Sequence, residues 1–90
     1  MKSSFEWDEL KSEACFIKRG FDFAYVIRAF LDPQKVIFQD ERFNYGERRY
    51  QLLGDIGGRI FVVVYTVRSG NIRIISARKA NERERRLYEY

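Results

Sequence analysis

The N-terminal part of the chain shows the hydrophobic pattern of a short strand followed by a helix. Phe5 and Trp7 alternate with polar residues, which predicts a strand. Asp8 follows, and its carboxylate can accept hydrogen bonds from the free amides of a first helical turn. We therefore expect a helix that begins after Asp8 and continues to about Lys18. The apolar residues that share one face of this helix are Leu10, Ala14 and Ile17.

A longer apolar stripe predicts a second helix. Gly20 suits the left-handed position just past the end of the first helix, and Asp22 suits the N-cap of the next. Asp32 and Pro33 end the second helix, because proline disfavours helical geometry in the residue before it. The stripe is typical of core packing, and it consists of Phe23, Val26, Ile27 and Phe30.

The remaining sequence predicts four strands and a final helix. The strands are expected at residues 36–38, 50–53, 60–67 and 72–77, with a loop at 40–47 and turns at 55–58 and 69–71. These turns are too short for crossover connections, so the strands must pair antiparallel. The continuous apolar run at 60–67 indicates a strand buried on both faces. Asn81 and Glu84 form a capping-box pattern that begins the last helix.

The predicted order is therefore β-α-α-β-β-β-β-α, an α+β fold in a single domain of residues 1–90. A hydrophobic content of 46% supports a real core. Cys15 is the single cysteine, which excludes an intramolecular disulfide and favours a reducing compartment, and we expect it to be buried. The N-terminus lacks a signal-peptide pattern, and no apolar run approaches the ~20 residues that span a bilayer. We expect a soluble, cytoplasmic protein without a membrane association.

The positive charge of the chain is concentrated near its C-terminus. The formal net charge is +4, and residues 68–90 contain seven Lys/Arg against three Asp/Glu, which accounts for all of the excess. A localised basic surface attracts polyanions or acidic proteins. The alternative is a solvated terminal helix that is rich in arginine.

Several kinds of site are excluded by residue type. The chain has no histidine and one cysteine, which rules out the usual zinc sites and the Ser-His-Asp and Cys-His arrangements. No phosphate-binding glycine loop is present, because Gly54, Gly57 and Gly58 fit a hairpin turn instead. We expect no metal site and no cofactor.

Arginine is the remaining residue type that can bind an anionic ligand. Arg73 alternates with Ile72 and Ile74, so its side chain points to the opposite face of the sheet. A guanidinium suits phosphate because its planar fork makes two parallel hydrogen bonds. Tyrosine and phenylalanine side chains near these strands, including Phe43 and Tyr45, offer stacking surfaces for bases. The alternative to an anion site is that Arg73 and Arg78 pair with Glu82, Glu84 or Asp40. Composition alone leaves three functions open: RNA binding, a protein-binding module, and no inferable role.

Three stretches of the sequence resemble BrnT, the ribonuclease toxin family of BrnT–BrnA toxin–antitoxin systems. The stretches are Phe5-Glu6-Trp7-Asp8 with 18–23, then 46–50 with Leu53-Gly54, and then 62–66 with 73–80, Glu84, Arg85 and Tyr88. The resemblance implies a RelE-like fold with a twisted antiparallel sheet, and translation inhibition through RNA cleavage. It also implies a partner, a BrnA-like ribbon-helix-helix antitoxin, through which the toxin–antitoxin complex binds operator DNA. The complex can contain a toxin dimer.

Two departures from the family affect the expected site. The family often has histidine where Arg19 stands, and another near Phe43, and neither is present. Another group must therefore transfer protons, because arginine is effectively never a base. We predict that Arg73 and Arg78 are catalytic residues that stabilise the negative charge of the phosphate. Glu47, Tyr65 and Lys79 are the candidates for proton transfer or positioning. The expected RNA-binding residues are Arg19, Arg48, Arg49 and Arg83.

Two competing hypotheses remain from the sequence. The absence of histidine favours a degenerate relative that only binds its antitoxin. A DNA-binding protein is the third class, which we rank low because no helix-turn-helix pattern is present and the last helix is short.

Overall fold

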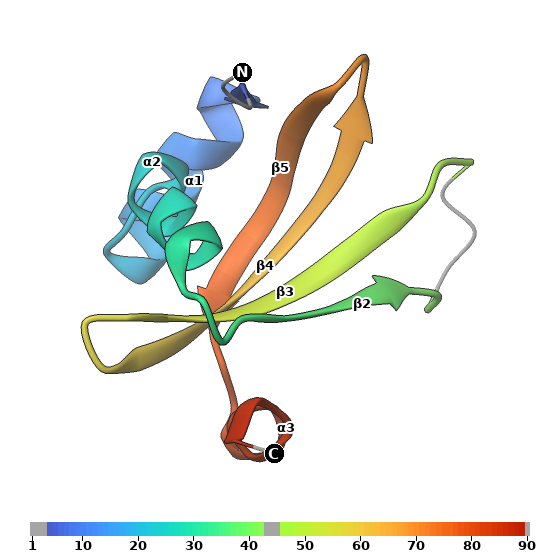
Figure 1. The fold of residues 1–90 in the computed structure, drawn as a ribbon. Coiled ribbons are helices and arrows are strands. Elements are labelled where there is room, and N and C mark those ends of the chain that lie inside the picture. Colours follow the sequence, from blue (N-terminus) through green and yellow to red (C-terminus); the bar gives the residue numbers. More distant parts are fainter. Residues whose placement is uncertain (1–3, 43–45, 90) are drawn as a thin grey trace.

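The computed structural model describes residues 4–42 and 46–89 and shows an α+β fold (Figure 1). Compared with the expected order, it adds a 3-10 helix, η1, that continues the second helix. The elements are β1 (Phe5–Trp7), α1 (Glu9–Arg19), α2 (Phe23–Val26), η1 (Ile27–Leu31), β2 (Val36–Asp40), β3 (Arg49–Ile56), β4 (Arg59–Arg68), β5 (Asn71–Lys79) and α3 (Glu82–Glu89).

The five strands form one mixed sheet in the order β1-β5-β4-β3-β2. The antiparallel pairing expected for the later strands is confirmed, because β2, β3, β4 and β5 pair antiparallel with their neighbours. The first strand is the exception, since β1 pairs parallel with β5. Figure 1 shows that the strands fan apart with a strong twist.

The predicted helix caps are confirmed. Asp8 accepts from the amides of Leu10 and Lys11, and Gly20 takes a left-handed φ of 89° after α1. Asp22 accepts from the Tyr25 amide at 2.9 Å and begins α2. The second helix is tighter than predicted, because it becomes 3-10 from Ile27 onward and ends before Asp32.

The core lies between the sheet and the helices α1, α2 and η1. Phe23 and Val26 are buried and Ile27 and Phe30 pack against the core, which confirms the apolar stripe. Cys15 is buried as expected, its thiol donates to the Ala77 carbonyl at 3.7 Å, and burial raises its pKa. The prediction that the fourth strand is buried on both faces is confirmed, because residues 61–66 are all buried.

The predicted turn at 55–58 is wrong in its first half. Asp55 and Ile56 belong to β3, and only Gly57 and Gly58 form the turn. Gly54 is not a turn residue either, because it is buried in β3 opposite η1. A Cβ at Gly54 would lie 2.6 Å from the Ala29 carbonyl oxygen, so glycine is needed for η1 to pack closely on the sheet.

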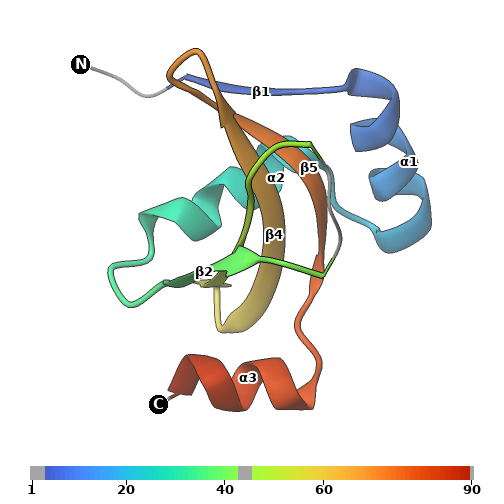
Figure 2. The ribbon, with the colours of Figure 1, turned by 90° about the vertical axis from the view of Figure 1, so that its right-hand side faces the viewer.

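The last helix lies on the opposite side of the sheet from α1 and α2 (Figures 1 and 2). Its capping box is confirmed, because the Asn81 side chain accepts from the Glu84 amide and the Glu84 carboxylate accepts from the Asn81 amide. Near its other end the Tyr88 hydroxyl donates to Asp32, which raises the pKa of Tyr88 to about 12. These side chains hold a helix that has no buried residue of its own. None of the helices in the described parts of the chain is long and apolar enough to cross a membrane.

Candidate functional site

The sheet face that points away from α1 and α2 carries several arginines. Ile72 and Ile74 pack towards the core, so Arg73 projects from the other face of β5. The same alternation applies to β3 and β4. The residues of this surface, called the arginine face below, are Arg49, Arg68, Arg73 and Arg78.

Each member of the arginine face is paired with a glutamate. Arg78 makes the shortest contacts, because its two terminal nitrogens donate to the two carboxylate oxygens of Glu84 at 2.7 Å. The other pairs are Arg73 with Glu6 at 3.2 Å, Arg68 with Glu47 at 3.1 Å and Arg49 with Glu47 at 3.5 Å. The positive charges of this face are therefore largely neutralised within the chain.

The pairing also changes how easily the glutamates accept protons. Hydrogen bonds from Arg78 hold the pKa of the Glu84 carboxyl below its ordinary value, and those from Arg68 do the same for Glu47. A carboxyl with a lowered pKa is a weaker proton acceptor. Glu47 is therefore less suited to general base catalysis than its residue type suggested.

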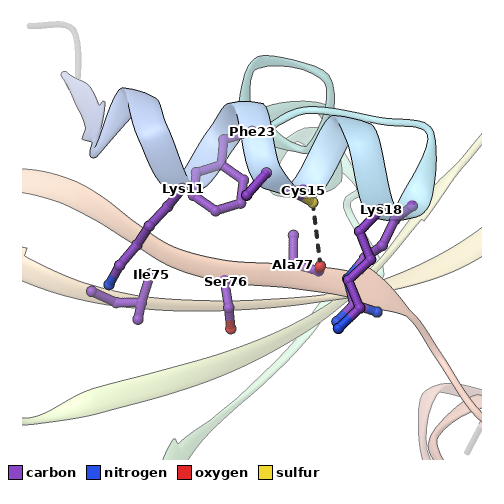
Figure 3. Close-up of a pocket in the computed structure, with 9 residues that line it drawn as sticks. Lys11, Cys15, Lys18, Phe23, Ile75, Ser76 and Ala77 are labelled. Atoms are coloured by element: carbon purple, nitrogen blue, oxygen red, sulfur yellow. Dashed lines mark hydrogen bonds between the residues drawn. The ribbon is translucent and has the colours of Figure 1, made fainter.

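A different arrangement is found where β5 becomes an edge of the sheet. β1 ends at Trp7, opposite Ile74, so in the described part of the chain no strand lies outside the second half of β5. The helix α1 runs along this edge instead, held by the bond from Cys15 to Ala77 (Figure 3). Arg19 is the last residue of α1 and Lys79 is the last residue of β5.

Two neighbouring cavities open beside the C-terminal ends of α1 and β5, and together we call them the edge pocket. The first has a volume of about 180 Å³ and is lined by Arg19, Phe21, Arg78 and Lys79. The second has a volume of about 470 Å³ and shares three of these residues. Its full lining consists of Phe16, Arg19, Gly20, Phe21, Asp22, Tyr25, Phe61 and Lys79.

Two cations of the edge pocket lack the pairing seen on the arginine face. Among residues 4–42 and 46–89, no carboxylate lies within 4 Å of the charged groups of Arg19 or Lys79. Arg19 also has a structural role, since a cation in the last turn of α1 is stabilised by the helix dipole. That interaction leaves its guanidinium donors available to an anion.

The edge pocket also contains aromatic rings and a carboxylate that sequence reasoning did not select. Phe21 packs edge-on against Phe61 with ring centroids 5.0 Å apart, and Tyr25 packs against the same ring at 5.8 Å. Tyr25 remains 37% exposed. Asp22 was predicted only as a helix cap, and its position two residues after Gly20 was the one available signal that it would lie near Arg19.

The structure brings together Arg19, Arg78 and Lys79 and separates the other predicted residues from them. Tyr65 lies in the core on the helix side of the sheet, stacked on Tyr50 at 5.4 Å, and burial raises its pKa. The sheet therefore stands between Tyr65 and the side chains of the arginine face. Arg48 is exposed and directly precedes β3.

Arg83 is exposed on α3 and borders a separate cavity of about 270 Å³ beneath that helix, together with Asp40 and Glu84. Phe43 and Tyr45, which were expected as stacking surfaces, lie outside the described residues. Within the part of the chain that is described, no group of three or more His, Cys, Asp or Glu side chains is arranged to hold a metal ion.

Comparison with known families gives one match. A family model described as "Ribonuclease toxin, BrnT, of type II toxin-antitoxin system" matches residues 7–84, which is most of the 90-residue chain. Comparison with curated proteins finds no match.

Proposed function

The chain belongs to the BrnT family of ribonuclease toxins of type II toxin–antitoxin systems, and from this we propose that it is an endoribonuclease that inhibits translation by cleaving RNA in the cytoplasm. The proposal includes a RelE-like fold, a reaction that needs no metal ion, and neutralisation by a BrnA-like ribbon-helix-helix antitoxin. Operator DNA is contacted only through that antitoxin. A type II toxin has a protein antitoxin as its partner.

The edge pocket is the proposed RNA site, and one observation carries this choice. Arg19, Arg78 and Lys79 converge there, and two of these cations have no carboxylate partner within 4 Å among the described residues. An RNA phosphate can accept hydrogen bonds from Arg19 and Lys79 without displacing a carboxylate of the described residues, whereas Arg78 must share its donors with Glu84. Tyr25, which is 37% exposed and carries the Arg28 guanidinium 5.6 Å above its ring, lines the second cavity beside the phosphate and can contact the neighbouring nucleotide.

The proposed reaction is attack by a ribose 2′-hydroxyl on the adjacent phosphorus. A bond forms between the 2′ oxygen and phosphorus, and the bond from phosphorus to the 5′ oxygen breaks. The products are a 2′,3′-cyclic phosphate and a free 5′-hydroxyl. Arg19 and Arg78 stabilise the charge on the phosphate oxygens. Asp22 accepts the proton of the 2′-hydroxyl and Lys79 donates a proton to the leaving oxygen.

Replacing Asp22 with asparagine tests the assignment of the proton acceptor. Asparagine caps a helix about as well as aspartate, so α2 is expected to keep its N-terminal hydrogen bond to the Tyr25 amide. The carboxylate base is lost, and we expect the cleavage rate to fall about 100-fold or more. The measurement is cleavage of labelled RNA in the presence of EDTA, with Asp8→Asn as the matched control at the other helix cap.

Equal rates for Asp22→Asn and the wild-type chain would remove Asp22 from the mechanism. Loss of all wild-type cleavage on adding EDTA would contradict the proposal that no metal ion is needed. Both results are read against the thermal unfolding of each variant, which separates a chemical defect from a folding defect.

A second function is favoured by the pairing on the arginine face. Its guanidinium groups are neutralised by glutamates, and the family histidines are absent, as expected for a relative that binds its antitoxin without cleaving RNA. This alternative predicts no cleavage of free or ribosome-bound RNA by the wild-type chain, together with normal antitoxin binding.

A further inference from the structure

The outer face of α1 is an apolar surface that the described structure leaves uncovered. The sequence places Leu10, Ala14 and Ile17 on one helical face, and this face points to solvent rather than to the core. Leu10 is 78% exposed and Ile17 is 80% exposed. The buried side of α1 is instead formed by Ser12 and Cys15, which are small. An amphipathic helix normally directs its large apolar residues inward, so this reversed arrangement requires an explanation.

Two lysines border this apolar face. Lys11 and Lys18 are seven residues apart, which is about two helical turns, so both lie on the same side of α1. Both line a cavity of about 210 Å³ between α1 and β5 to which Ala14 also contributes. Figure 3 shows the two lysines reaching from α1 towards β5 with Ser76 between them. In the described segments, no carboxylate lies within 4 Å of either ammonium group.

We infer that this face of α1 is a docking surface for an acidic, amphipathic segment of the protein antitoxin. Apolar residues of that segment cover Leu10, Ala14 and Ile17, and carboxylates beside them pair with Lys11 and Lys18. Charge complementarity places the partner's carboxylates at the Lys11 and Lys18 border, because Glu9 and Glu13 follow the opposite border of the face. The exposed apolar residues supply the area that a purely electrostatic contact lacks. The inference rests on the proposed function, because it assumes a toxin that is neutralised by a protein partner.

The position of the surface also suggests how binding stops RNA cleavage. Lys18 is adjacent to Arg19, which lines both this cavity and the edge pocket. A segment that pairs with Lys18 and continues past the C-terminal turn of α1 therefore covers the proposed RNA site. Neutralisation then results from exclusion of RNA and requires no change in the fold of the toxin.

The test measures the affinity of the full chain for a purified BrnA-like antitoxin, the partner named in the proposed function, by titration calorimetry. Leu10→Gln combined with Ile17→Gln keeps good helix formers at exposed positions, so the fold is expected to survive. We expect this variant to raise the Kd for the antitoxin by at least about tenfold and to leave RNA cleavage by the free chain unchanged. Leu31→Gln is the matched control, because Leu31 is also 80% exposed but lies on η1.

A second variant tests the charged border of the surface. Lys11→Glu combined with Lys18→Glu is expected to weaken antitoxin binding at least as much, and the loss should depend on salt. Antitoxin affinity within about twofold of wild type in both double variants overturns the inference.

Two further results assign the surface to another occupant and also overturn the inference. In the first, the lysine variant loses RNA cleavage and keeps antitoxin binding, which makes the surface part of the RNA site. In the second, the leucine and isoleucine variant abolishes self-association of the toxin and keeps antitoxin binding, which makes the occupant a second copy. Cleavage by the free wild-type chain is recorded in parallel, so failure of the proposed function is distinguished from failure of this inference.

Discussion

The arginine face and the edge pocket are both basic, and they differ in how their charges are balanced. On the arginine face, Arg73 is paired with Glu6 and Arg78 with Glu84. In the edge pocket, Arg19 and Lys79 have no such partner within 4 Å among the described residues. The density of arginines along the sequence therefore does not locate an anion site. The positions of the carboxylates, which depend on strand pairing, decide which cations are available to a ligand.

The difference between the two regions has an energetic consequence for RNA binding. A phosphate that binds both terminal nitrogens of Arg78 must compete with the two 2.7 Å hydrogen bonds that Arg78 donates to Glu84. Charge-assisted bidentate pairs of this kind are stronger than ordinary hydrogen bonds, so the competition reduces the net gain. A phosphate that binds Arg19 or Lys79 has no carboxylate of residues 4–42 and 46–89 to displace. The edge pocket should therefore dominate the affinity for RNA.

The largest expected effect comes from removing the two cations of the edge pocket that have no carboxylate partner among the described residues. Arg19→Ala combined with Lys79→Ala should reduce RNA cleavage by about 100-fold or more, because each lost hydrogen bond to a charged group is worth about 1.5–3 kcal/mol. The measurement is the initial rate of cleavage of a labelled RNA. Arg59→Ala combined with Arg85→Ala removes the same formal charge at exposed positions outside the edge pocket and should cleave at nearly the wild-type rate. A similar loss in both double variants would reduce the effect to general electrostatics.

A smaller effect is expected from converting a paired cation into an unpaired one. Glu84→Gln keeps the amide-accepting oxygen of the capping box but removes the negative charge that holds Arg78. We expect RNA affinity to rise about fivefold and to become more dependent on salt, as one further phosphate contact would produce. Fluorescence anisotropy with a labelled RNA at several salt concentrations measures both quantities. An unchanged affinity would mean that Arg78 does not reach the bound RNA.

The same variant should change how stability depends on pH. The pKa of Glu84 is lower in the folded chain than in the unfolded chain, so its pairing stabilises the fold above about pH 5 and this contribution is lost as the pH falls through the folded value. The wild-type free energy of unfolding should therefore fall more steeply in acid than that of Glu84→Gln, by about 1 kcal/mol in total. Urea unfolding between pH 3 and pH 7 (roughly the range in which carboxylates titrate) provides the comparison, and parallel curves for the two chains would contradict it.

The smallest effect is expected at Arg73, although the sequence predicted it to be catalytic. Arg73 is paired with Glu6 and does not line the edge pocket, so Arg73→Ala is expected to change the cleavage rate by no more than about threefold, less than one lost charged hydrogen bond would cost. Glu6→Gln serves as the partner variant and should behave similarly. A loss of cleavage comparable to that of the Arg19 and Lys79 variant would restore Arg73 to the site and favour the arginine face.

Features that depend on neighbouring residues were predictable from the sequence, and features that depend on contacts between distant parts of the chain were not. The caps at Asp8 and Asp22 and the capping box at Asn81 were predictable, because each depends on hydrogen bonds between neighbouring residues. The role of Gly54 was not, because it depends on Ala29, which approaches from a distant part of the chain.

Site residues were predicted less well for the same reason. The parallel pairing of β1 with β5 places Glu6 opposite Arg73, and no local pattern signals this register. Tyr65 has a suitable residue type for proton transfer, but its alternation within β4 directs it into the core. The meeting of Arg19 with Lys79 depends on how α1 packs along the edge of β5, which a single sequence does not specify.

The most direct test of RNA binding at the edge pocket is to locate bound RNA on the folded chain by NMR. A non-cleavable oligonucleotide with 2′-deoxy or 2′-methoxy sugars is titrated into the ¹⁵N-labelled protein, and shifts of the backbone amides are followed. We expect the largest shifts at Arg19, Phe21 and Lys79, with small ones at Arg68 and Arg73. The largest shifts at Arg68 and Arg73, with Arg19 and Lys79 unaffected, would contradict the account.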